Sequence, residues 1–135
     1  MKTCNLFYIY YSVLQSNPIL ESFGNARTVR NDNSSRFGKF IEIQFTTSGN
    51  LMGASIEVYL LEKVRLITQA KGERNYHIFY EILSGASPEE REKFFLKDSG
   101  VHDFRMTSLS ETYDRRDGVK DYETYNDLRN GKAQL

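Results

Sequence analysis

A change of hydrophobic period near Phe37 constrains the fold of this chain more than any other feature. Upstream, in Ser16–Ala26, the apolar residues Ile19, Leu20 and Phe23 recur at helical spacing. Downstream, apolar and polar residues alternate, which is typical of a strand with one face turned toward a core. The sequence therefore predicts a helix that is followed by extended chain.

The alternating part predicts an antiparallel hairpin. Its first strand spans Phe37–Phe45, a turn follows at Thr46–Asn50 with a glycine at its tip, and the return strand spans Leu51–Leu61. Gly53 marks a candidate bulge in the return strand. Because a two-stranded hairpin is marginally stable by itself, we expect further strands or helices to cover it.

Two helices are predicted after the hairpin. Tyr76 and Phe79 lie on one side of a helix over Asn75–Leu83. Ser87–Glu90 forms a capping-box pattern, which predicts a second helix over Pro88–Leu96 anchored by its two phenylalanines. The expected fold class is α/β, with a helix, an antiparallel hairpin and then two or more helices.

The remainder of the chain, Lys97–Leu135, is polar and charged. We interpret its charge run, Asp114–Asp121, as a solvated surface, because such runs face water in most proteins. Tyr122–Arg129 is a candidate helix. His77, in the first of the two predicted helices, fits a packed or capping histidine better than a metal ligand, because no cluster with metal-ligand spacing accompanies it.

Composition limits the class of protein. With 135 residues the chain has the length of one domain, and its 18 basic and 18 acidic residues cancel. The zero net charge gives no bulk field that would attract nucleic acid or a membrane surface. The single cysteine, Cys4, excludes an intrachain disulfide and favours a reducing cytoplasm.

Met1–Leu14 has a lysine near its start and a short apolar run. We interpret this stretch as a buried helical segment, with an export signal as the alternative.

The polar stretch Arg30–Lys39 suits contact with an anion. Mg²⁺ takes oxygen ligands and keeps several waters, so Ser34 and Ser35 could supply a metal ligand and a phosphate contact. Asn31 and Asn33 can donate or accept hydrogen bonds, and Arg36 can pair with a carboxylate or stabilise phosphate charge. The alternative is a solvated turn, since Asn, Asp and Ser are ordinary turn residues.

Several blocks of the sequence resemble the myosin motor domain, in that family's order and spacing. The resemblance is strong over residues 14–84, weak and divergent over 97–135, and treats 1–135 as part of one motor domain. The blocks are Ser16–Ile41, which resembles the switch I region, and then Gly53–Ile56, Tyr59–Lys63 and Gly72–Tyr80.

The resemblance implies a slice of a P-loop NTPase-type motor in which ATP hydrolysis is coupled to movement on actin filaments. It implies that Ser35 ligates Mg²⁺ and that Ser34 and Asn31 contact the ATP phosphates. Asn33 is a further nucleotide-binding candidate, and with Asn25 and Arg27 it shapes the loop. Ser34 and Arg36 are the catalytic candidates, with Arg36 bridging to a glutamate of the second switch.

The chain lacks two elements of that machinery, the phosphate loop and the second switch. We therefore expect Arg36 to be unpaired and the chain to be inactive by itself. The expected partners are actin filaments and the remaining motor segments, with no nucleic acid and no membrane span, in the cytoplasm and cytoskeleton. The alternative is a truncated, non-catalytic remnant or interaction piece.

Overall fold

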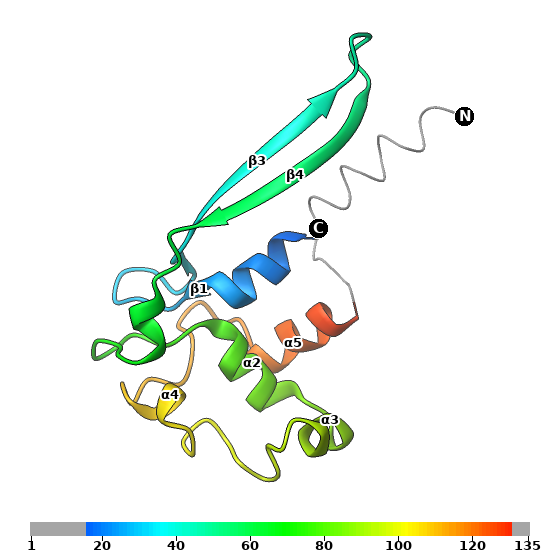
Figure 1. Ribbon diagram of the computed structural model, residues 1–135. Helices are drawn as coiled ribbons and strands as arrows, with labels where there is room; N and C mark the ends of the chain where they lie inside the picture. Colours follow the sequence, from blue (N-terminus) through cyan, green and yellow to red (C-terminus); the bar gives the residue numbers. More distant parts are fainter. Residues whose placement is uncertain (1–15, 131–135) are drawn as a thin grey trace.

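A long hairpin projects from a body of short helices and loops in the computed structural model, which describes residues 16–130 (Figure 1). The body holds the helix over residues 16–24, drawn in blue, and the later helices. This order of helix, hairpin and further helices confirms the predicted α/β architecture. The prediction for Met1–Leu14 lies outside the described residues.

The hairpin consists of β3 (Gly38–Phe45) and β4 (Leu51–Tyr59), which pair antiparallel along their whole length. Its turn closes with Gly49 at a φ of +79°, a conformation that glycine adopts without steric cost. The register shifts so that Met52 is the extra residue, directly before Gly53. The bulge predicted from the glycine therefore lies one position earlier.

The apolar side chains of the hairpin are uncovered in the part of the chain that the structure describes. Each of those named here is at least half exposed, which is unusual for the inner face of a sheet. The expected covering elements are thus not supplied by residues 16–130. These side chains are Phe40, Ile43, Phe45, Met52 and Val58.

The first helix is shorter than predicted. Residues 16–24 are helical, but Asn25 and Ala26 form a two-residue strand, β1 (Asn25–Ala26), instead of a last helical turn. An added Cβ on Gly24 would lie 2.3 Å from the ring of Phe37, so the helix ends where only glycine fits against that ring.

Two helices follow the hairpin, after a 3₁₀ turn η1 (Lys63–Leu66). They are α2 (His77–Gly85) and α3 (Pro88–Lys93). The capping box of α3 is confirmed by hydrogen bonds in both directions between Ser87 and Glu90. The helix stops short of Leu96, and the prediction that Phe95 anchors it is wrong: Phe95 has a φ of +58° and is 88% exposed.

The segment after Lys97 is more ordered than its composition indicated. It contains α4 (Arg105–Ser108) and α5 (Asp121–Arg129), and α5 packs against α2 (Figure 1). Tyr125 of α5 lies so close to Gly85 that an added Cβ there would approach its ring to 2.8 Å. The candidate helix near the end of the chain is confirmed. Most of the charge run Asp114–Asp121 is exposed, as interpreted, with Arg115 and Asp121 half-buried.

Polar side chains fill much of the interior of the body. Arg74 and Asn75 are completely buried, and His77 and Glu81 are each only 1% exposed. Buried polar groups need partners, because leaving a donor or acceptor unpaired costs about 1–3 kcal/mol. The body is therefore held by directed hydrogen bonds as well as by apolar packing.

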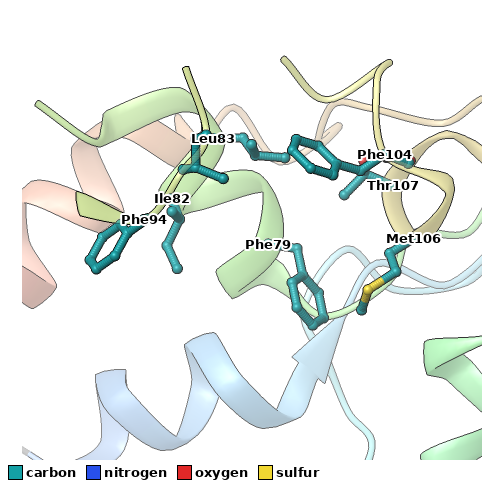
Figure 2. A pocket seen from close by; sticks show the side chains of 8 residues that line it. Phe79, Ile82, Leu83, Phe94, Phe104, Met106 and Thr107 are labelled. Carbon is teal, nitrogen blue, oxygen red and sulfur yellow. Dashed lines mark hydrogen bonds between the residues drawn. The ribbon is translucent and has the colours of Figure 1, made fainter. Parts of the chain in front are cut away.

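An apolar cavity of about 250 Å³ lies between α2 and the segment that contains α3 and α4 (Figure 2). Its polar lining atom, the hydroxyl of Thr107, donates to the backbone carbonyl of Val101 at 2.5 Å. The cavity thus presents carbon to any occupant. Its lining residues are Phe79, Ile82, Leu83, Phe94, Leu96, Phe104, Met106 and Thr107.

Candidate functional site

The predicted anion-binding residues lie on one closed loop, residues 27–36, which we call the polar loop. Its base is a two-residue ladder between β1 and β2 (Ser34–Ser35), with Ala26 opposite Ser34. Beyond the ladder, the amide of Arg36 donates to the carbonyl of Gly24 at 2.8 Å. Ala26 is fully buried and also pairs with Tyr76, so the base is fixed to the start of α2.

Hydrogen bonds inside the polar loop set the direction of its chain. The hydroxyl of Thr28 accepts from the amide of Asn31 and donates to the carbonyl of the same residue, both at 3.1 Å. The amide of Asn33 donates to Oδ1 of Asn31 at 2.8 Å. The side-chain oxygen of Asn31 thus shapes the loop.

The two serines differ in what they contact. Oγ of Ser34 accepts from Nη1 of Arg36 at 3.2 Å and is part-buried. Ser35 is exposed, and within residues 16–130 its hydroxyl makes no hydrogen bond. The exposed hydroxyl of Ser35 is therefore free to meet a ligand, whereas the hydroxyl of Ser34 already accepts a hydrogen bond from Arg36.

Arg36 is paired, so the expectation that it lacks a partner is wrong. Its Nε donates to Oε2 of Glu62 at 2.7 Å, and the amide of Glu62 donates to the carbonyl of Arg36 at 3.0 Å. Arg65 also donates to Oε2 of Glu62, at 2.7 Å. The hydrogen bond from Arg36 is the main reason that the pKa of Glu62 lies below its usual value, and the same bond raises the pKa of Arg36.

Hairpin register explains how Arg36 finds this carboxylate. Gly38 pairs with Tyr59, so continuing the ladder places Arg36 beside the residues that directly follow β4. The alternation that predicts the hairpin therefore also contained a signal for the partner of Arg36, which the sequence analysis missed. In this structure the carboxylate that pairs with Arg36 is therefore that of Glu62, from the same chain.

The outer side of the polar loop is bound by the charge run near the end of the chain. Nη1 of Arg27 donates to Oδ1 of Asp114 at 3.1 Å, and Nε of Arg116 donates to both carboxylate oxygens of Asp32 at 3.1 Å. Arg116 also donates to the carbonyl of Val29. These contacts join residues more than 80 positions apart, and no local pattern in the sequence signals them.

The inner side of the polar loop contacts α2. Nδ2 of Asn25 donates to Oδ1 of Asn33 at 3.0 Å, and Nε2 of His77 lies 3.1 Å from the same oxygen. The pKa of His77 falls to about 3, mainly because the ring is buried and secondly because of the neighbouring charge of Arg115. The prediction of a packed histidine is confirmed, and Asn25 and Asn33 do shape the loop.

The site presents hard oxygen donors and a guanidinium on one loop. Mg²⁺ takes hydroxyl and carbonyl oxygens, so the exposed Ser35 is a chemically suitable ligand. In contrast, the apolar cavity offers no polar atom to hold a phosphate.

Over the described part of the chain, no three His, Cys, Asp or Glu side chains gather to hold a metal ion. No helix among these residues has the length and apolar character needed to cross a bilayer.

Comparison with known proteins gives the family. The family model described as "Myosin head (motor domain)" matches residues 2–134. A non-muscle myosin heavy chain of Drosophila melanogaster is 69% identical over 86 residues, which are 64% of this chain and 4% of that protein. Myosin-1 of Arabidopsis thaliana is 50% identical over 121 residues, which are 90% of this chain and 10% of that protein.

A similar match is found with Myosin-1 of Saccharomyces cerevisiae, at 54% identity over 116 residues, which are 86% of this chain and 6% of that protein. This chain therefore spans a tenth or less of the length of these three relatives. The family model, in contrast, matches nearly the whole of the chain, including the segment after Lys97. On this evidence the chain belongs to the myosin head (motor domain) family.

Proposed function

We propose that the polar loop is the nucleotide-sensing switch I of a myosin motor head that hydrolyses ATP and moves on actin filaments. One observation carries the proposal: in a chain of this family, a loop fixed at its base presents the exposed hydroxyl of Ser35, while the guanidinium of the following residue, Arg36, lies against the hydroxyl of Ser34. A hard oxygen ligand and a fixed cation are what a metal-bound phosphate requires.

The side chains would divide the work as follows. Ser35 is the Mg²⁺ ligand, and Asn31 and Ser34 contact the phosphates. Asn33 is the further nucleotide-binding residue and helps to hold the phosphates in place. Bound Mg²⁺–ATP would supply the transferable phosphoryl group and the metal's Lewis acidity. The residues of the chain would bind and orient it, because phosphoryl transfer is catalysed mainly by positioning and charge.

Arg36 has a further requirement in this proposal. Its guanidinium is engaged by Glu62 and lies 3.2 Å from Ser34. To pair with a carboxylate of a second switch, the guanidinium must either release Glu62 or use Nη2, the nitrogen that neither Glu62 nor Ser34 engages. Since both Arg36 and Glu62 are about one-third exposed, the pair is accessible to exchange.

The proposed setting is the cytoplasm and cytoskeleton, with actin filaments and other motor segments as partners. A second function, that of a non-catalytic piece that binds other motor segments, is favoured by the uncovered apolar side chains of the hairpin, such as Phe40 and Phe45. In both cases we propose that residues 1–135 alone do not hydrolyse ATP at a useful rate, since they contain no phosphate loop.

The roles are tested in a chimaeric head in which this chain replaces the corresponding segment of a relative. Ser35→Ala is expected to weaken Mg²⁺–ATP binding, and Arg36→Ala to slow hydrolysis with less effect on binding, measured by single-turnover kinetics. Ser48→Ala, in the hairpin turn, and the exposed Arg30→Ala are the matched controls. Normal hydrolysis in the Arg36 variant would show that its assigned role is wrong.

The isolated chain tests the proposal that residues 1–135 are inactive by themselves. Residues 1–135 are purified, their folding is checked by circular dichroism, and Mg²⁺–ATP binding and phosphate release are measured with and without actin filaments. We expect neither tight binding nor actin-stimulated release. Release that actin stimulates and that Ser35→Ala abolishes would show that the chain is a self-sufficient motor element.

A further inference from the structure

A continuous line of hydrogen bonds runs from α5 through the body to the polar loop. It begins at Asp121, whose two carboxylate oxygens accept from Nη1 and Nη2 of Arg74, both at 2.8 Å. Nη2 of Arg74 lies 3.1 Å from Nδ1 of His77, and Nε2 of His77 lies 3.1 Å from Oδ1 of Asn33. Nδ2 of Asn33 reaches Oε2 of Glu21 at 3.1 Å.

The contact with Arg74 fixes the tautomer of His77. A guanidinium can only donate, so Nδ1 of His77 must accept from Arg74. A neutral imidazole carries one proton, which is then on Nε2, where it points at Asn33. Burial keeps His77 neutral, since its pKa falls to about 3. Among the two neutral tautomers, only the Nε2–H form satisfies both contacts.

The contact with Glu21 independently fixes the orientation of the Asn33 side-chain amide. An ionised carboxylate only accepts, so the group that Asn33 turns toward Glu21 must be its NH₂. Its carbonyl oxygen then faces His77 and also accepts from Nδ2 of Asn25. The contact with Arg74 and the contact with Glu21 therefore require the same direction of donation: Arg74 donates to His77, His77 to Asn33, and Asn33 to Glu21.

We propose that His77 is a positioning residue of the polar loop: its Nε2–H holds the amide of Asn33, and through Arg74 it links the loop to α5. Asn33 directly precedes Ser34, and its backbone amide is bound by Asn31. Holding Asn33 thus holds the neighbouring hydroxyls in the orientation that a nucleotide needs. The inference rests on the function proposed for the polar loop, because it deepens the account of that site.

The tautomer gives a direct spectroscopic test in the full 135-residue chain. Histidine labelled with ¹⁵N is followed by NMR that correlates ring nitrogens with ring protons. The chain has two histidines, and His102→Gln assigns the signals. At pH 7 we expect the Nε2–H tautomer at His77. An Nδ1–H tautomer or an imidazolium at this pH would overturn the proposal, and no substitution at position 77 is needed to reach that result.

Variants in the chimaeric head test the consequence for the loop. His77→Phe keeps a ring but removes both nitrogens, whereas His77→Gln keeps an N–H donor and an acceptor. We expect the phenylalanine variant to lose about tenfold in kcat/KM for Mg²⁺–ATP, the effect of losing one hydrogen bond to the site, and the glutamine variant to recover most of it. His102→Phe is the matched control, because the exposed His102 contacts Tyr113 and lies outside the network.

The outcomes separate the two proposals. Equal loss in both His77 variants, or no loss in either, would overturn the positioning role. A parent head that neither binds nor hydrolyses Mg²⁺–ATP would instead refute the proposed function of the polar loop. The tautomer of His77 is measured without nucleotide, so it still decides the positioning role in that event.

Discussion

The hairpin and the body are built on different physical principles. β3 and β4 are joined by a regular backbone ladder, and their apolar side chains are largely exposed. The body has a small apolar core and completely buried polar side chains such as Arg74, whose partner Asp121 lies 47 positions away. The hairpin therefore depends on local pattern, while the body depends on pairs that only the folded chain brings together.

This difference predicts how each region responds to substitution. A side chain that is already exposed loses little when it is changed, and such substitutions are usually within about 0.5 kcal/mol of neutral. A buried charge that loses its partner is left uncompensated, which is among the largest effects of a single substitution. Three predictions test this comparison.

The largest effect is expected at the buried ion pair. Arg74→Met should lower the free energy of unfolding by about 3–5 kcal/mol, because Asp121 keeps its charge without its partner. Arg116→Met is the matched control: Arg116 is 47% exposed, so losing its pair with Asp32 should cost about 0–1 kcal/mol. Urea denaturation of the full chain measures both. Equal losses would mean that burial does not set the difference.

Next in size is the pH dependence from two buried groups on α2. The pKa of His77 falls from 6.5 to about 3 on folding, so its contribution to stability is present above pH 6.5 and is lost as the pH falls toward 3. Burial raises the pKa of Glu81 from 4.5 to about 7, so its contribution is present below pH 4.5 and is lost as the pH rises through 7. Between pH 4.5 and 6.5 the two effects oppose each other.

Removing either group should therefore expose the other. In this window the stability of His77→Gln should fall with rising pH by about 1.4 kcal/mol per unit relative to the parent chain, and that of Glu81→Gln should rise by a similar amount. Urea midpoints at several pH values measure the slopes. Slopes of the same sign in both variants would contradict the assigned shifts.

The smallest of the three effects compares two glycines. A Cβ on Gly24 would lie 2.3 Å from the ring of Phe37, so Gly24→Ala should cost about 1–3 kcal/mol through overpacking. A Cβ on Gly53, in the hairpin, meets no atom within 4 Å, so Gly53→Ala should stay within about 0.5 kcal/mol of neutral. Thermal unfolding of both variants checks this, and a Gly53 variant as unstable as the Gly24 variant would remove the distinction between the regions.

Local chemistry explains which elements the sequence predicted. The hairpin follows from alternation, and α3 follows from the capping box at Ser87, since both depend on residues close in the chain. The predicted end of the first helix is wrong, because the helical pattern continues through Ala26 while the folded chain pairs that residue with Ser34. Tertiary pairing overrode a local preference there.

The candidate site was predictable only in part. The polar stretch Arg30–Lys39 stands out by composition, and the sequence also predicts the packing of His77. The ion pairs that hold the loop, such as Arg27 with Asp114 and Arg116 with Asp32, were not predictable, because charged residues have no periodic signal that names a partner. Only the partner of Arg36 could have been found, from the register that places Glu62 beside it.

The exposed hairpin has a consequence for how this chain behaves in concentrated solution. Within residues 16–130, β3 and β4 pair only with each other, so each strand has one edge of unpaired backbone groups. Such an edge beside apolar side chains like Ile43 and Phe45 is a template for a second copy. Charged residues such as Lys39 and Glu57 along the strands oppose this stacking. Aggregation should therefore begin at the hairpin while the body remains folded.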